Sequence, residues 1–244
     1  MKPLKDGLIL LIGAKTYGAL RYRGSPTSGR AWGGPMNGQG GRVRLVAELL
    51  LKTEPVAIVE TGTYRGTTTE WLAAFQLPVY TCEASGLNFG FSRARLGVVP
   101  NVHMLHMDSR SALRHLLTGP LSAQLDKPIL FYLDAHGSQD LPLAEEIDII
   151  FPTASRAIVL IDDFQVPDDP GYAYDDYGPG KLLTPDYIAE GVARHSLQCF
   201  YPRTPAERET GTRRGCIVLA KHADIIATLE GVANLRQLDA PAKG

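Results

Sequence analysis

Short apolar runs that alternate with helical segments follow Pro55, and this alternation constrains the fold more than any other feature. Five runs have the length and composition of buried strands: 56–60, 79–83, 102–106, 129–134 and 157–162. Between them lie predicted helices at 66–76, 87–97, 109–117 and 140–150. Near-continuous apolar strands separated by helices are typical of a parallel sheet that is covered on both faces. Right-handed crossovers then predict a doubly wound, Rossmann-like α/β fold.

The two ends of the chain depart from this alternation. Residues 196–201 and 215–220 read as two strands joined by a polar stretch without a helix, so we expect an antiparallel edge pair in a mostly parallel, seven-stranded sheet. Residues 1–41 form an N-terminal segment with a Gly/Pro-rich loop at 21–41, and residues 42–244 form one domain that begins with a helix at 42–52. Because long loops in compact domains are often functional, we interpret 21–41 as a lid that brings Asn37 and Gln39 to a ligand.

Composition excludes several classes of function. The formal net charge of −1 and the lack of a basic stripe argue against nucleic acid as a partner. The apolar run 7–13 is far shorter than the roughly 20 residues of a spanning helix, so we expect no membrane association. Cys82, Cys199 and Cys216 are isolated and lack zinc-site spacing, as expected of free thiols in a cytoplasmic protein.

The first strand ends in the loop Glu60-Thr-Gly-Thr-Tyr-Arg-Gly66, where an open α/β sheet binds its ligand. Gly62 permits a tight turn, and the free N–H groups near Gly66 and Thr67 favour an anionic group. Glu60 occupies the place of the first glycine in a G-x-G-x-x-G dinucleotide motif. A carboxylate there disfavours a pyrophosphate but suits the amino group of a methionyl moiety.

Acidic residues also follow the next two strands. Glu83 lies 23 residues after Glu60, a distance at which a carboxylate can accept both ribose hydroxyls of a nucleoside. Asp108-Ser109 opens a helix, where either residue can act as the N-cap and Asp108 can also accept from the exocyclic amine of adenine. A solvated carboxylate and a simple helix cap are the structural alternatives at these two places.

In this order the three signals resemble the class I S-adenosylmethionine-dependent methyltransferases, over roughly residues 40–220. The resemblance implies S-adenosylmethionine as cofactor. It also implies a set of cofactor-binding residues: Glu60, Gly62, Thr63, Tyr64, Gly66, Thr67, Glu83, Asp108 and Ser109.

Three carboxylates follow the fourth and fifth strands, and they suggest a metal. Asp134 comes after one strand, and Asp162 and Asp163 come after the next. Carboxylates so close together repel one another unless they are protonated or bind a cation, and hard oxygen ligands suit Mg²⁺. Separate strand-end caps, one acid to each strand, are the alternative interpretation.

This layout resembles metal-dependent O-methyltransferases of the catechol and macrocin types. The resemblance implies that Asp134, Asp162 and Asp163 hold a divalent metal, which the oxygen ligands indicate to be Mg²⁺. The metal then lowers the pKa of a substrate hydroxyl. Asp134 and His136 are then the catalytic residues. His136 stands one residue short of the basic position of those families, so its role as base and a structural role both stay open, with Lys181 as the reserve base.

We therefore expect an O-methyltransferase that acts on a hydroxyl of a small sugar, aryl or natural-product molecule. Loop 162–180, which holds six Asp and three Tyr, is either a solvated acidic loop or a substrate wall. The alternatives are a nicotinamide-dependent oxidoreductase and a methyltransferase-like protein with altered chemistry, such as the cephalosporin-hydroxylase type. The N-terminal segment offers a surface for a homodimer contact.

Overall fold

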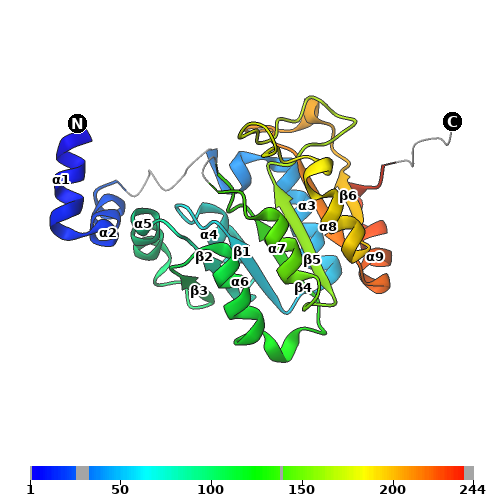
Figure 1. Cartoon of the computed structure of the whole chain (residues 1–244), viewed down its shortest axis with the longest axis horizontal. Coiled ribbons are helices and arrows are strands. Elements are labelled where there is room, and N and C mark those ends of the chain that lie inside the picture. Colours follow the sequence, from blue (N-terminus) through cyan, green and yellow to red (C-terminus); the bar gives the residue numbers. More distant parts are fainter. Residues whose placement is uncertain (1, 26–32, 138–139, 239–244) are drawn as a thin grey trace.

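The computed structural model describes residues 2–25, 33–137 and 140–238, and a twisted sheet lies at its centre (Figure 1). The order of the strands is β3-β2-β1-β4-β5-β7-β6-β8. Their bounds are β1 Ala57–Thr61, β2 Val79–Cys82, β3 Val102–Leu105, β4 Ile129–Leu133, β5 Ala157–Asp162, β6 Gln198–Pro202, β7 Cys216–Ala220 and β8 Leu235–Arg236. Strands β1 to β5 pair in parallel, whereas β7 is antiparallel to both β5 and β6. The mostly parallel sheet with an antiparallel edge pair is thus confirmed, and the two-residue β8 extends the seven strands that we expected.

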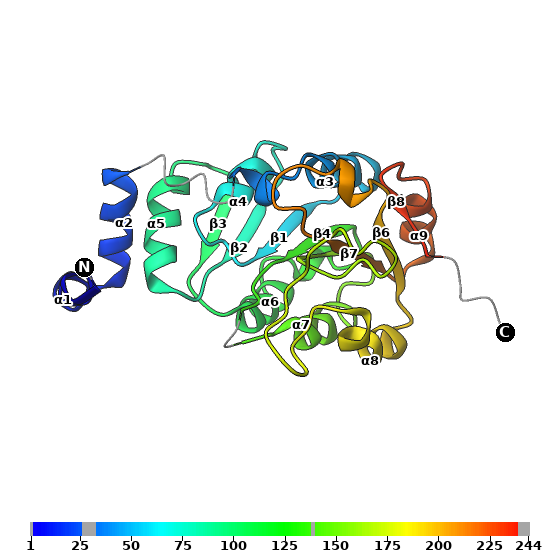
Figure 2. The same ribbon diagram turned by 90° about the horizontal axis from the view of Figure 1, so that it is seen from above.

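Helices cover both faces of the sheet (Figure 2). The helices of the described chain are α1 Lys2–Ile12, α2 Ala14–Gly24, α3 Gly40–Thr53, α4 Thr67–Ala73, α5 Gly86–Leu96, α6 Ser109–Thr118, α7 Leu143–Ile150, α8 Pro185–His195 and α9 Ala223–Glu230, with short 3-10 turns η3 Pro35–Gly38, η4 Ser122–Gln124 and η5 Ala206–Arg208. Helices α1 and α2 lie outside α5, away from the sheet (Figure 2). Side chains of α6, α7 and α8 pack into one apolar core, and those of α3, α4 and α9 pack into the other. Every residue of β1, β4, β5 and β7 is buried, which explains why these strands appear as unbroken apolar runs.

The prediction of one long loop at 21–41 is wrong at both of its ends. Helix α2 continues to Gly24, and α3 already begins at Gly40, while 26–32 lie outside the described residues. Helix α2 packs along α5 through glycines, since a Cβ at Gly18 would lie 2.1 Å from the Leu87 carbonyl oxygen. A helix that can dock so closely on a neighbour is stabilised by that packing despite its own weak propensity.

The topology creates a crevice at the carboxyl ends of β1 and β4. From β1 the chain adds β2 and β3 on one side, and it then returns to add β4 and β5 on the other side. Open α/β sheets bind ligands at this point of reversal. In the described part of the chain, no helix is both long and apolar enough to cross a bilayer, and the three cysteines are free thiols.

Candidate functional site

A cavity of about 740 Å³ opens above the carboxyl ends of β1, β2, β4 and β5. All of the predicted cofactor-binding residues except Gly66 line it, and so do Asp134, His136 and Asp163. The cavity is also lined by Asn37 of the predicted lid and by Ala173, Asp175 and Tyr177 of loop 162–180. Lining residues to which the sequence analysis gave no role are Gly34, Arg65, Thr68, Cys82, Ala84, Met107, Ala135, Asp140, Thr212 and Arg214. Residues far apart in the sequence therefore meet at the edge of the sheet where a ligand was expected.

The loop after β1 turns sharply at Gly62, which has a φ of +91°. The N–H groups of Gly62 and Thr63 both donate to the Cys82 carbonyl, which ties this loop to the end of β2. A Cβ at Gly62 would lie 2.3 Å from the carbonyl oxygen of Asp134. The glycine therefore serves both the turn and the close approach of the β1 and β4 loops.

We expect Gly62→Ala to destabilise the protein and to weaken binding of S-adenosylhomocysteine. The strained φ alone costs about 1–3 kcal/mol, and the new methyl group must push the Asp134 backbone away. Urea unfolding and calorimetric titration measure the two effects. Gly24→Ala is the matched control, because a Cβ there meets no atom within 4 Å. Equal behaviour of the two variants would contradict this role of Gly62.

Glu60 lies at the floor of the cavity and is 2% exposed. Its Oε2 accepts hydrogen bonds from the hydroxyls of Thr69 and Thr81, the second at 2.6 Å. Burial raises its pKa to about 7, with a smaller contribution from the charge of Glu83. A buried carboxylate with such a pKa gains most from a cationic partner.

Glu83 and Asp108 lie along the same wall of the cavity. The two oxygens of Glu83 accept from the backbone N–H groups of Tyr64 at 2.9 Å and Ser85 at 2.7 Å, so the carboxylate is held in one orientation. Asp108 caps α6 by accepting from the N–H of Ser111 at 3.1 Å. The cap role of Asp108 is thus confirmed, and each carboxylate keeps acceptor capacity toward the cavity.

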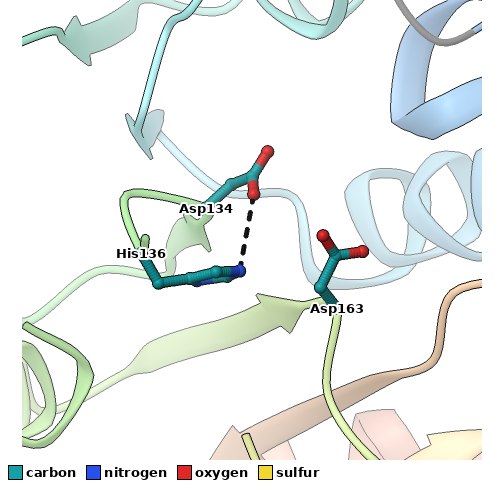
Figure 3. A group of neighbouring side chains, drawn as sticks. All are labelled: Asp134, His136 and Asp163. Atoms are coloured by element: carbon teal, nitrogen blue, oxygen red, sulfur yellow. Dashed lines mark ion pairs between the residues drawn. The ribbon is translucent and has the colours of Figure 1, made fainter. Parts of the chain in front are cut away.

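Three potential metal ligands gather at the other end of the cavity (Figure 3). One ligand atom from each of Asp134, His136 and Asp163 lies within 4.8 Å of the others. The Nε2 atom of His136 lies 3.7 Å from Asp134 Oδ1 and 3.5 Å from Oδ2 of Asp175, and it has no hydrogen-bond partner among the described residues. A buried ring nitrogen without a partner, facing two carboxylates, fits a divalent cation.

The pKa values of this group are displaced in the directions that crowding predicts. Burial and the charges of Asp162 and Asp163 raise the pKa of Asp134 well above its ordinary value. Burial and the charge of Asp162 raise the pKa of Asp163 to about 6. Burial lowers the pKa of His136 to about 4, so its imidazole is neutral near pH 7 and can act as a ligand. A bound cation would stabilise both carboxylates in their ionised form.

Asp162 is placed differently from our expectation that it binds the metal. Its side chain is 2% exposed and forms an ion pair with the equally buried Arg42. Its other oxygen accepts from the hydroxyl of Tyr132, and Oδ1 also accepts from the N–H of Asp163 at 2.8 Å. Burial opposes ionisation, but Arg42 and these hydrogen bonds hold the pKa of Asp162 below its ordinary value. The carboxylate is committed to these partners, and the group of potential ligands contains His136 where we expected Asp162.

Arg214, Asp175 and Tyr177 complete this end of the cavity, and no motif in the sequence pointed to the arginine. Its Nε donates to Asp163 Oδ1 at 3.0 Å, and its guanidinium also pairs with Asp175. The hydroxyl of Tyr177 donates to the other oxygen of Asp175. The acidic loop 162–180 thus folds against the site and supplies four lining residues, Asp163, Ala173, Asp175 and Tyr177. Lys181, the reserve base, is exposed and does not line the cavity.

The predicted lid residues have different positions. Asn37 lines the cavity, with a left-handed φ of 59°. Gln39 is fully buried, and its amide bonds the backbone of Arg214 in both directions, accepting from N at 2.9 Å and donating to O at 2.8 Å. Gln39 therefore joins this segment to the chain before β7, and it does not reach into the cavity.

No family profile and no curated protein matches the sequence. Solved structures do match the fold. A candidate caffeoyl-CoA O-methyltransferase from Staphylococcus aureus is 13% identical over 74% of this chain and 83% of its own, with a TM-score of 0.53. A candidate O-methyltransferase from Klebsiella pneumoniae is 16% identical over 91% and 97%, with a TM-score of 0.49, and a Bacillus cereus O-methyltransferase in complex with S-adenosylhomocysteine is 15% identical over 75% and 80%, with a TM-score of 0.46. At these identities the likeness concerns the fold alone, which is the Rossmann-like α/β fold that we expected.

Proposed function

We propose that the chain is an S-adenosylmethionine-dependent O-methyltransferase that is assisted by a divalent metal and acts on a hydroxyl of a small molecule. One observation carries the proposal: a single cavity joins a wall of acidic hydrogen-bond acceptors to a separate group of metal ligands. The first part suits a cationic amino-acid group and a nucleoside, and the second suits a chelating oxygen.

The donor would lie across the ends of β1, β2 and β3. Glu60 would accept from its amino group, Glu83 from the ribose hydroxyls and Asp108 from the adenine amine. The turn at Gly62 approaches the backbone of Asp134 closely, so the sulfonium end would lie near Asp134. Holding the methyl group and the acceptor oxygen in line is the main contribution such a site can make to the rate.

Asp134, His136 and Asp163 would hold the cation. Mg²⁺, which we expected from oxygen ligands alone, suits the two carboxylates, and Mn²⁺ also accepts the imidazole nitrogen. When bound, a divalent cation lowers the pKa of a substrate hydroxyl, so that the oxygen attacks the sulfonium methyl at neutral pH. Because Nε2 of His136 faces two carboxylates and the pKa of the ring is lowered to about 4, the ligand role suits His136 better than the role of general base that we first considered.

The acceptor would be polar. Among the described residues, those that line the cavity include no Leu, Ile, Val, Phe or Trp. At the metal end the wall presents the side chains of Asn37, Tyr177, Thr212 and Arg214. Such a wall provides hydrogen bonds and one aromatic ring, which favours a polyhydroxylated acceptor over a flat apolar one.

Ligand-dependent stability tests the choice of cofactor. S-adenosylhomocysteine at 100 times its Kd is expected to stabilise the protein by about 2.7 kcal/mol, which appears as a rise in Tm. Mg²⁺ should raise Tm further, and NADH should have no effect. A rise with NADH alone would overturn the proposal in favour of a nicotinamide enzyme.

The affinity for S-adenosylhomocysteine should increase with pH. Below its pKa of about 7 Glu60 is neutral, and it becomes the carboxylate that pairs with the ligand's ammonium group as the pH rises. Between pH 6 and pH 8 the ionised fraction increases by about tenfold, and the affinity should follow it. Calorimetric titration at both pH values measures this change, and Glu60→Gln should bind weakly at both. An unchanged pH dependence in Glu60→Gln would contradict the role of Glu60.

A further inference from the structure

Arg42 is a buried cation that the proposed reaction does not use. It lies in the first turn of α3, and its side chain is 2% exposed. The backbone N–H groups of Gly41 and Arg42 donate to the two carboxylate oxygens of Glu209, at 2.8 and 3.1 Å, and Glu209 is itself buried. The start of α3 is therefore fixed to the chain before β7, and Arg42 extends from a rigid base.

The guanidinium of Arg42 connects the end of β5 to the segment before β7, and both border the cavity. One nitrogen pairs with Asp162 at the end of β5, and the other donates to the backbone carbonyl of Arg214 at 2.6 Å. The hydroxyl of Tyr132 donates to the other carboxylate oxygen of Asp162. Asp162 and Arg214 lie 120 and 172 residues away from Arg42 along the chain.

Both contacts act on Asp163. Asp162 Oδ1 accepts from the N–H of Asp163, which has a left-handed φ of 52° that a non-glycine residue adopts only under constraint. The backbone of Arg214 is held by Arg42, and its side chain donates to Asp163 Oδ1 at 3.0 Å. One buried guanidinium thus supports Asp163 in two ways. It fixes the backbone of Asp163 through Asp162, and it fixes the side chain of Asp163 through Arg214.

We propose that Arg42 is a positioning residue of the metal site: it holds Asp162 beneath the cavity so that Asp163 alone presents its carboxylate beside Asp134 and His136. This inference rests on the proposed function, because it concerns the ligands of the metal. Stability alone does not account for the pair, since apolar residues of similar volume often replace a buried ion pair without loss. The planar fork of arginine, which binds two acceptors at fixed angles, does account for it.

Arg42→Lys tests the inference, because lysine keeps the charge but cannot bind both acceptors in this geometry. Mn²⁺ and S-adenosylhomocysteine are titrated separately into the full chain by calorimetry. We expect Mn²⁺ to bind about 10–100-fold more weakly, as is typical when a supporting partner of a ligand is lost, with unchanged affinity for S-adenosylhomocysteine. Arg194→Lys is the matched control, since Arg194 pairs with Asp148 and Glu190 far from the cavity and should affect neither titration.

A second variant keeps the test decisive if Arg42→Lys does not fold. Arg42→Met with Asp162→Leu removes both charges together, so neither charge is left buried without its counterion, and we expect the same selective loss of Mn²⁺ affinity. Wild-type Mn²⁺ affinity in a folded variant, or an equal loss of both ligands, would overturn the inference and leave the proposed function intact. If the wild-type protein itself failed to bind Mn²⁺, the proposed metal site would be overturned together with the inference.

Discussion

Asp134→Asn is expected to weaken Mn²⁺ binding by more than about 100-fold, because it removes a ligand charge from the centre of the group. Methyl transfer to a hydroxylated acceptor should fall by a comparable factor, since a metal that polarises the acceptor contributes several kcal/mol to the transition state. Asp134 is the member of the group whose pKa the surroundings raise most clearly, so it has most to gain from a cation. Calorimetric titration of the variant with Mn²⁺ measures the loss.

The same variant should bind S-adenosylhomocysteine almost normally, because Asp134 lies at the metal end of the cavity. Asp224→Asn is the control: this exposed carboxylate on α9 pairs with Arg156 and is remote from the site. Retained Mn²⁺ affinity in Asp134→Asn would exclude Asp134 from the ligand group and with it the metal-assisted mechanism.

Asp162→Ala is expected to destabilise the fold by about 3–5 kcal/mol, because it leaves the buried guanidinium of Arg42 without its counterion. Asp163→Asn, one residue further on, should leave the stability of the fold unchanged or increase it. Its carboxylate is repelled by Asp162, and its pKa is raised to about 6, so the folded state disfavours the charge that the variant removes. The free energies of unfolding in urea measure both changes.

These two substitutions separate adjacent carboxylates that look equivalent in the sequence. If Asp162→Ala and Asp163→Asn altered stability by the same small amount, the buried pair with Arg42 would not be the main interaction of Asp162. A large loss of stability in Asp163→Asn alone would reverse the two assignments.

The sheet was predictable because its central strands are buried on both faces and carry little but apolar residues. The acidic residues after β1, β2, β4 and β5 were also predictable as one site, since parallel strands bring their carboxyl ends to the same edge. The roles of Asp162 and Asp163 were not resolved. Asp162 is the last residue of β5, and the chain turns at Asp163 with a left-handed φ of 52°, so the two side chains meet different partners. The sequence does not show where this turn falls.

What the sequence could not supply were pairings between distant segments. Arg214 reaches the cavity from the start of β7, and nothing near it in the sequence marks it as a site residue. Arg42 did carry a signal. Leu45 and Val46 follow it by three and four residues, so Arg42 lies on the buried face of α3. An arginine on such a face requires a buried carboxylate as its partner. Which carboxylate it meets depends on the packing of α3 against β5, and spacing alone does not determine that.

A crystal structure of the chain with S-adenosylhomocysteine and Mn²⁺ tests the central claim most directly. We predict the nucleoside along Glu83 and Asp108, the amino group at Glu60, and an anomalous Mn²⁺ peak between Asp134, His136 and Asp163 with Asp162 still paired to Arg42. An empty cavity at saturating ligand, or a Mn²⁺ peak coordinated elsewhere, would contradict the account.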